Sequence, residues 1–417
     1  MIYLKNMKVW IKYIIGIALG LIVALILPVD NAVMAGILSF LNDLVIHIGR
    51  YVVVPLIFCT TIVSFNKLRS SKLILKTSIW TFSIIIISSL LLTFVGILSI
   101  LTVKLPRIPI TVDTSTDTFV LGVKNMILSL FPFSAFNSIL EGSFLLVGFL
   151  FAALIGWESA VNVESTIFKP VFTLADSLSK LFYNIAVFFT EAMSILCIVI
   201  MCCWTVSFKS IILSGIYTPM IIMFLVDLIL IVGVIYPLII RYLCHDPHPY
   251  RVLYASIAPA LLSFISGDSN LVLPLTIRHA KESLGIRRRC GGFTFPLFSI
   301  FARGGSALVT TISFILIWRS YSSLSIPFTD VLWIFGVSFG LSFLLGGLPS
   351  GCAFILLTIL CGKYARGFET SFLLLKPAAL IICSFATLFD TITAMFGSYI
   401  VAVKTKMIEH HTIQHFI

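Results

Sequence analysis

The stretch 253–277, LYASIAPALLSFISGDSNLVLPLTI, decides the fold because it is apolar on both sides of a polar break at 266–270. About 12 apolar-leaning residues precede the break, or about 18 Å of helix, whereas a bilayer core is about 30 Å thick. Neither half spans a membrane alone. Backbone that leaves the helix at membrane depth must be buried in protein or face a wet cavity. Broken helices of this kind carry solute sites in transporters, and a kinked span capped by Asp268 is the plainer interpretation.

Composition places the chain among polytopic helical membrane proteins. Of its 417 residues, 59% are hydrophobic and 11% are charged, and apolar runs longer than about 18 residues recur from end to end. The net charge of +11 comes from short basic clusters between these runs, which indicates membrane topology rather than a nucleic-acid partner. The nine cysteines follow no disulfide or zinc pattern, and no motif indicates an enzyme or a cofactor.

The apolar runs predict an all-α protein with eight transmembrane helices and two further broken segments. The spans are expected at about 10–28, 34–66, 73–103, 118–156, 166–205, 211–243, 291–318 and 370–403, and the broken segments at 253–285 and 326–362.

The basic clusters predict how the broken segments enter the membrane. With a cytoplasmic N-terminus, the clusters at 67–76, 241–251, 278–289 and 404–406 all stay inside only if 253–285 dips in and returns. The segment 326–362, broken at 346–351, is then a hairpin that enters from outside. Two opposed re-entrant hairpins form an inverted repeat with a site at the midplane. Both termini are expected on the cytoplasmic side, in a bacterial inner membrane.

At these residues the chain resembles the dicarboxylate/amino acid:cation symporter family, the glutamate/aspartate transporters. The similarity covers nearly the whole chain, and its stretches include FPFSAFNSILEGSFLLVGFLFAALIG (131–156), HDPHPYRVLYASIAPALLSFISGDSNLVLPLTIRHAKESLGI (245–286), FTFPLFSIFARGGSALV (293–309), GGLPSGCAFILL (346–357) and GSYIVAVKTK (397–406).

The resemblance implies a homotrimer that carries a small solute by an elevator mechanism. Spans 1–2 (10–72) and 4–5 (118–205) are then a static scaffold. Span 3 (73–117) and residues 206–405, with span 6, both hairpins, span 7 and span 8, are a mobile transport domain, and residues 406–417 are a cytoplasmic tail.

Several positions depart from the family pattern. The Ser-rich first hairpin tip reads Asp268-Ser269-Asn270 here. The seventh-span motif Asn-Met-Asp-Gly-Thr falls on residues 302–306, so Ala302 and Gly304 replace both side-chain sodium ligands and Arg303 stands between them. Hard cations need several oxygen ligands, which puts sodium coupling in doubt.

Two alignments of the eighth span remain open. Pairing GSYIVA with the family's Gly-Thr-x-Ile-Val-Ala puts Asp390 on an Asn, Ala394 on the sodium-binding Asp, Ala386 on the substrate-carboxylate Arg and Cys383 on the amine-binding Asp. The rival puts Asp390 on the amine-binding Asp and Thr393 on the Arg, and it requires a deletion of about two turns. We prefer the first, because a deletion shortens the span.

Arg303 lies in an otherwise uncharged run, 291–318, and a central arginine in a membrane needs an anionic partner. Asp390 and Asp268 are the candidates, and a purely structural pair stays open. Asp227 is expected to contact a hydroxyl on a neighbouring span or to relay protons.

The candidate site follows from the resemblance and from these charges. The substrate-binding candidates are Asp268, Ser269, Asn270, Arg303, Gly304, Ser306, Leu348, Pro349, Ser350, Gly351, Cys383, Ala386, Thr387 and Asp390. The degenerate sodium positions are Ser88, Ser89, Ala302, Gly304, Asp390 and Ala394.

The predicted function is secondary transport of an amino-acid or carboxylate-class solute. The alternative is a sodium-independent exchanger or proton-coupled transporter in which Arg303 replaces the bound sodium. A transport-dead receptor or a channel is the rival of another class. Because Ala386 carries no charge, glutamate, aspartate and succinate are expected to be poor substrates.

Overall fold

The computed structural model describes residues 7–27, 32–109, 145–161, 169–322, 326–348, 351–364, 367–409 and 416, and their regular structure is helical apart from one isolated bridge between Ile286 and Ile408. The elements are α2 (Val9–Ile26), α3 (Ala32–Arg50), α4 (Val53–Ser70), α5 (Ile74–Thr102), α8 (Leu145–Val161), α9 (Lys169–Ser214), α10 (Thr218–Leu228), η1 (Ile229–Ile235), α11 (Tyr236–Ile239), η2 (Ile240–Cys244), α12 (Tyr250–Ser266), α13 (Ser269–Glu282), α14 (Arg288–Phe301), α15 (Gly304–Tyr321), α16 (Phe328–Ser342), η3 (Phe343–Gly347), α17 (Cys352–Tyr364), η4 (Ser371–Leu375) and α18 (Ala379–Lys404).

Eight helical stretches of the described residues are long and apolar enough to cross a membrane, which confirms an all-α, polytopic fold. These eight stretches are not the same eight that the sequence predicts. The stretch Phe328–Gly346, predicted as half of a hairpin, qualifies by length and composition. Of the predicted span 118–156, residues 118–144 lie outside the described residues, and α8 is shorter than a full span.

Two helix boundaries also differ from the prediction. Helix α9 is continuous for 46 residues to Ser214, past the expected end at 205, because the intervening Ser207-Phe208-Lys209 contains no helix breaker. Helix α18 begins at Ala379 rather than near 370. Pro377 and the 3₁₀ turn η4 precede it, and proline supplies no N–H to a preceding helix.

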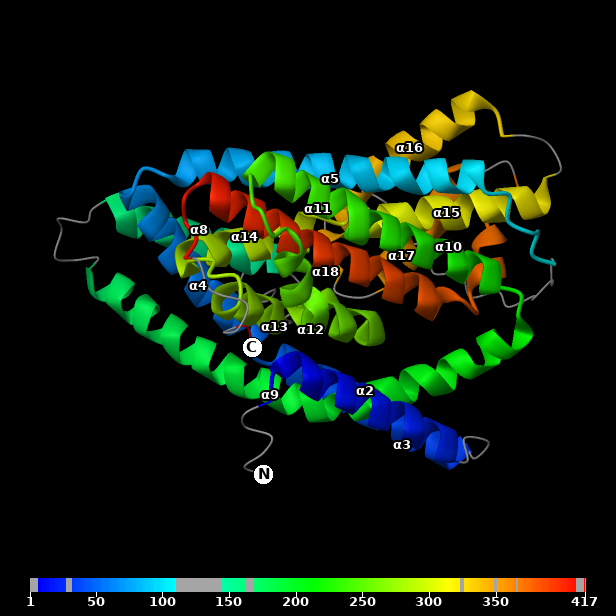
Figure 1. Ribbon diagram of the computed structural model, residues 1–417, viewed down its shortest axis with the longest axis horizontal. Helices are drawn as coiled ribbons and strands as arrows, with labels where there is room; N and C mark the ends of the chain where they lie inside the picture. The colour runs from blue at the N-terminus through cyan, green and yellow to red at the C-terminus, as the bar shows by residue number, and fades with distance from the viewer. Residues whose placement is uncertain are drawn as a thin grey trace.

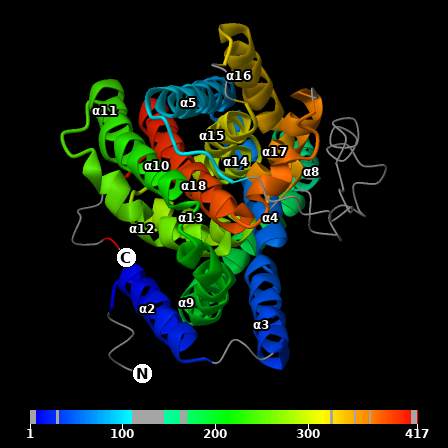
Figure 2. The same ribbon diagram turned by 90° about the vertical axis from the view of Figure 1, so that its right-hand side faces the viewer.

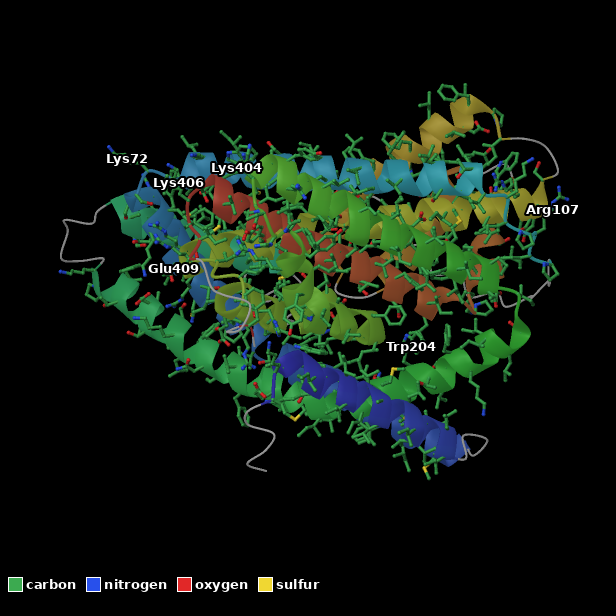
Figure 3. All side chains as sticks on the ribbon, viewed as in Figure 1. Lys72, Arg107, Trp204, Lys404, Lys406 and Glu409 are labelled. Carbon is green, nitrogen blue, oxygen red and sulfur yellow. The ribbon has the colours of Figure 1, made fainter. Side chains whose placement is uncertain are left out.

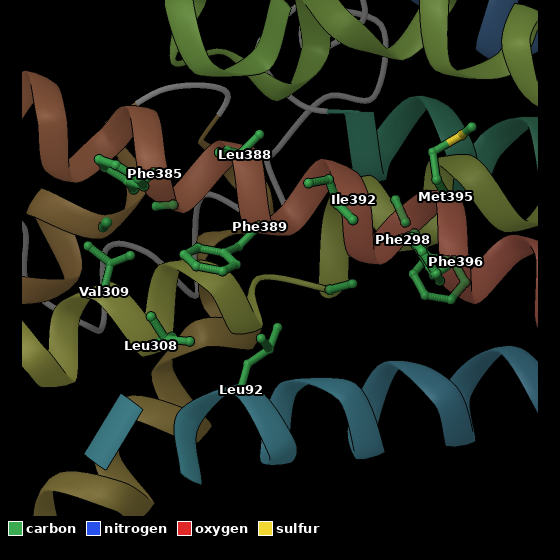
Figure 4. Packing of buried hydrophobic residues seen from close by; sticks show 14 of the residues in the cluster. Leu92, Phe298, Leu308, Val309, Phe385, Leu388, Phe389, Ile392, Met395 and Phe396 are labelled. Atoms are coloured by element: carbon green, nitrogen blue, oxygen red, sulfur yellow. The ribbon is translucent and has the colours of Figure 1, made fainter. Parts of the chain in front are cut away.

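The molecule has a buried bundle with an outer layer of helices (Figures 1 and 2). Helices α14, α15 and α18 lie inside, while α2, α3 and α9 lie together along one side. In the most apolar 18 residues of the stretch Arg288–Tyr321, 94% of the residues are buried, whereas in α2 only 28% are buried. Figure 4 shows the packing where α5, α15 and α18 meet, around Leu92, Leu308 and Phe389. The core therefore surrounds the break between α14 and α15.

The first broken segment doubles back. Helices α12 and α13 pack against each other across a turn at Gly267, whose φ of 60° is readily adopted by glycine. Arg251, before the segment, donates to the Tyr399 hydroxyl at 2.7 Å, and the Arg287 N–H, after it, donates to the Met407 carbonyl at 3.1 Å. Both flanks therefore lie at the C-terminal end of α18.

The second broken segment also returns to its starting end. The Tyr364 hydroxyl, at the end of α17, donates to Asp330 in the first turn of α16 at 2.8 Å. Arg319 at the end of α15 reaches the Val103 carbonyl after α5 at 3.2 Å, so this end is the one where α5 finishes. The open ends of the two segments thus lie at opposite ends of the molecule.

Basic residues gather at the end where the first segment opens (Figure 3). Lys72, Lys404 and Lys406 lie together there, and Arg107 lies at the opposite end. We call these the basic end and the far end. Lys67 and Arg288 share one carboxylate, Asp176, at distances of 3.3 and 3.6 Å. The clusters that the positive-inside rule assigned to one side are therefore on one side of the structure.

Candidate functional site

Arg303 occupies the break between α14 and α15 and joins the tips of both broken segments. Its side chain is the largest among those fully buried in the described chain, with 1% of the residue exposed. The Nη2 group donates to the Ser269 hydroxyl at 2.8 Å and to the Leu348 carbonyl at 3.3 Å. Ser269 begins α13 and Leu348 follows η3. One guanidinium therefore holds the two tips together.

Asp390 of α18 is the anion nearest to this guanidinium, with Nη1 and Oδ2 separated by 3.8 Å. The predicted anionic partner of Arg303 is thus present. The same carboxylate accepts from the Gly305 N–H at 2.7 Å and from the Ser306 hydroxyl at 2.9 Å. The pair is 2% and 5% exposed in its side chains, so it lies in a region of low dielectric where an isolated charge costs several kcal/mol.

The guanidinium keeps unused donors despite its burial. Among the described residues, Arg303 Nε and Nη1 have no hydrogen-bond partner. Buried donors without partners carry a desolvation penalty of about 1–3 kcal/mol. A bound carboxylate or carbonyl group would relieve that penalty, so the break is equipped to bind an acceptor.

Two glycines let α18 and α5 approach the break. A Cβ on Gly305 would lie 2.8 Å from Asp390 Oδ1, and one on Gly304 would lie 2.6 Å from Ser89 Cα. Both distances are shorter than van der Waals contact. The aspartate that the family carries at position 304 therefore does not fit here without displacing α5.

Few side-chain oxygens beside the break are free among the described residues. Asp390 already accepts from Gly305 and Ser306, and a permanent cation lies beside it. Ala302, Gly304 and Ala394 offer no side-chain oxygen, while the Ser89 hydroxyl is buried without a partner in the described chain. Within the described residues, no three His, Cys, Asp or Glu side chains cluster as metal ligands.

Asp268 pairs with a residue that the sequence analysis missed. Its Oδ2 lies 2.5 Å from Nε of Arg50 in α3, and its Oδ1 caps α13 by accepting from the Asn270 N–H at 2.9 Å. Asp268 is therefore not a partner of Arg303. The signal for Arg50 was available, because it is the only arginine or lysine in the apolar run 34–66.

A small cavity lies beside Arg303, between α13, α14 and α18. Its volume is about 20 Å³, with room for about one water molecule. Of the predicted site residues, it is lined by Ser269, Arg303, Asp390 and Ala394. The hydroxyl of Ser306 and the carbonyl of Leu348 contact these groups.

Other predicted residues lie away from the cavity or outside the described chain. Thr387 donates to the Ser263 carbonyl of α12 at 2.9 Å, and Ala386 packs its carbonyl beside Gly305. Neither these residues nor Asn270, Gly351, Cys383 or Ser88 lines the cavity. Pro349 and Ser350 lie outside the described residues.

The eighth span is one continuous helix. Helix α18 is 26 residues long, or about 39 Å, and both alignments of the eighth span are compatible with that length. The predicted hydroxyl contact of Asp227 is also present, since Ser99 of α5 donates to Asp227 Oδ2 at 3.0 Å.

A second polar network went unpredicted. Glu191 of α9 lies 2.5 Å from Lys12 of α2 and 2.8 Å from Arg278 of α13. Arg278 also donates to the Thr190 hydroxyl at 2.9 Å. Helix α13 is thereby tied to α2 and α9 by charge as well as by packing.

Apolar spans around a broken helix, with a buried ion pair at the break, characterise a membrane transporter. The chain belongs to the sodium:dicarboxylate symporter family, whose model matches residues 9–404. It is an integral membrane protein of a family that transports amino acids and dicarboxylates.

Among curated proteins, the chain is similar to the neutral amino acid transporter B(0) of Homo sapiens, of Macaca fascicularis and of Rattus norvegicus. Each match has 25% identity over 122 residues, which is 29% of this chain. The matched region spans 22% of the length of each relative, about a fifth.

Proposed function

We propose that the protein is a sodium-independent secondary transporter of a small neutral solute of the amino-acid class. The observation that carries the proposal is Arg303, which contacts both tips and lies beside Asp390. In a sodium-coupled relative, bound cations let the second hairpin close. Here a tethered cation at the same break already joins the tips, so the solute alone controls closure.

The solute preference follows from the charges that remain. Asp390 is satisfied by Arg303, Gly305 and Ser306, and Ala386 offers no cation for a second carboxylate. The free donors of Arg303 suit one carboxylate, such as that of an amino acid. The similarity to transporters named for neutral amino acids agrees with this preference.

The structural arrangement supports an elevator mechanism. Residues 253–285 and 326–362 are the two opposed re-entrant hairpins, and they form the transport domain with residues 73–117 and the remainder of 206–405. Residues 10–72 and 118–205 form the scaffold, through which we propose that three copies assemble in a bacterial inner membrane. The Arg50–Asp268 and Glu191–Arg278 pairs then cross the scaffold–transport interface.

Uptake by purified protein in liposomes tests the proposal. We expect neutral amino acids to exchange in counterflow at equal rates in sodium and in choline, with glutamate, aspartate and succinate at least about tenfold slower. Lipid vesicles without protein are the control. Aspartate uptake that saturates at micromolar concentrations, or uptake abolished when choline replaces sodium, would contradict the proposal. Absence of counterflow with any solute would favour a receptor or channel.

Accessibility labelling tests the membrane topology. In a cysteine-free background, Tyr250→Cys and Arg287→Cys are expected to react with an impermeant maleimide from the same side, because both flank the first hairpin. Arg107→Cys is expected to react from the other side. Labelling of positions 250 and 287 from opposite sides would show that 253–285 crosses the membrane.

A further inference from the structure

A cleft at the basic end is separate from the site around Arg303. It lies between the loop that joins η2 to α12 and the C-terminal end of α18, and its volume is about 560 Å³. Its polar lining is rich in hydrogen-bond donors, contributed by His245, His248, Arg251, Tyr399 and Lys406. The cleft is therefore suited to an anionic group.

Asp246 is the only acidic residue that lines the cleft among those described, and it is already engaged. It accepts from the Tyr399 hydroxyl, from Arg251 Nη2 at 2.8 Å and from the His248 N–H at 3.0 Å. Burial alone would raise the pKa of this carboxyl, but these hydrogen bonds and the Arg251 charge lower it below its usual value. Asp246 thus orients Arg251 without needing a ligand.

Arg251 retains a donor that is not used. Its Nε is buried and has no hydrogen-bond partner in the described part of the chain, while Nη2 is held by Asp246 and Tyr399. Lys406 is exposed at the rim and makes no ion pair with a described residue. Two cations therefore line the cleft, which favours a phosphate group as its occupant.

An apolar groove adjoins the cleft along the membrane-spanning helices. It has a volume of about 180 Å³ and is lined by side chains of α5, α11, η2 and α18. The surface that these side chains present to the groove is apolar. Leu243 lines the groove, and the next residue, Cys244, lines the cleft. On α18, Ile400 lines the groove and Val403, one turn further on, lines the cleft. The two hollows are therefore neighbours.

The mouth of the groove has the features of a membrane interface. Trp80 lines the groove, and the Lys404 ammonium lies 5.6 Å from the centre of its ring. Ile87, also in the lining, is 61% exposed on the outer surface of α5. Tryptophan and lysine are both enriched where headgroups meet acyl chains.

We propose that the cleft and the groove together bind one anionic phospholipid of the leaflet at the basic end, with the phosphate between Arg251 and Lys406 and an acyl chain along the groove. A headgroup alone would leave the apolar groove uncovered, and a zwitterionic lipid would bring its own cation next to Arg251 and Lys406. The bound lipid holds the η2–α12 loop against the end of α18.

Native mass spectrometry of the delipidated protein tests the proposal, with phosphatidylglycerol, phosphatidylcholine and inorganic phosphate as probes. We expect one phosphatidylglycerol per chain to bind at least about tenfold more tightly than phosphatidylcholine. Lys406→Gln is expected to weaken that binding about fivefold. Lys76→Gln, which removes an exposed lysine at the same end but outside the cleft, is the matched control and leaves binding unchanged.

Ser83→Trp fills the groove from α5 without altering a charge. We expect it to weaken phosphatidylglycerol binding at least about fivefold while the thermal unfolding midpoint stays within a few degrees. Equal affinity for the two lipids, or equal effects of Lys76→Gln and Lys406→Gln, would overturn the proposal. Competition by inorganic phosphate alone, with Ser83→Trp silent, would assign the cleft to a free anion and overturn it too.

Discussion

Arg303→Met is expected to abolish uptake and to destabilise the protein by about 3–5 kcal/mol, because it leaves the Asp390 carboxylate buried without its cation. It also removes the hydrogen bonds that join Ser269 and Leu348. Thermal unfolding in detergent measures the stability, and counterflow measures the transport. The effect is expected to be large, since the guanidinium contacts Ser269, Leu348 and Asp390 on three separate buried elements.

The double variant Arg303→Met with Asp390→Asn separates charge from packing. The asparagine still accepts from the Gly305 N–H but carries no charge, so we expect at least half of the lost stability to return. Transport is expected to stay absent, because the tips are no longer joined by a cation. Equal destabilisation in the single and double variants would show that the 3.8 Å pair contributes through packing alone.

Sodium provides the sharper test of cation replacement. In Arg303→Met, the Asp390 carboxylate and the Ser306 hydroxyl that donates to it lose the neighbouring cation, so sodium is expected to raise the unfolding midpoint relative to choline at equal ionic strength. The unsubstituted protein and the double variant are expected to show no difference. If sodium stabilises the unsubstituted protein to the same extent, Arg303 does not stand in for a bound ion.

The sequence was sufficient to predict that the first broken segment doubles back, because the physics of that segment is local. Half-length apolar helices, the Gly267 turn and the basic flanks predict a doubled-back segment without any tertiary information. The need of Arg303 for an anion was also predictable from a lone charge in an apolar run. Which carboxylate supplied it was not, because that depends on how α18 packs against α15.

The partner of Asp268 could not be predicted from the sequence. Asp268 and Asp390 were equivalent as partners of Arg303, and only the packing of α3 beside the first tip separates them. Similarly, Ala386 and Thr387 lie on faces of α18 that contact α15 and α12, which no spacing rule predicts. Helix direction and rotation relative to neighbours are set by tertiary contacts rather than by local pattern.

The pair of Arg50 and Asp268 is expected to hold the proposed transport domain against the scaffold in the conformation seen here. The Asp268 side chain is 1% exposed, so solvent does not reach the carboxylate of the 2.5 Å contact between Oδ2 and Arg50 Nε. Any sliding of the first hairpin along α3 must break it. Removing the pair is therefore expected to favour other positions of the domain, by about 1–3 kcal/mol or roughly 5–150-fold in the equilibrium.

Asp268→Asn is the suitable change, because asparagine is as good an N-cap as aspartate and keeps the start of α13. Spin labels at Phe188 of α9, in the proposed scaffold, and at Tyr242 of η2, in the proposed transport domain, report the distance between the two domains, because both residues are highly exposed. We expect Asp268→Asn to add a second distance population, and Asp43→Asn, an exposed acid on the same α3, to leave the distribution unchanged. Asp268→Ala should lose about 0.5–2 kcal/mol of stability beyond Asp268→Asn, since it also removes the cap. A distance distribution that is identical in all the variants would mean that the pair does not restrain the domain.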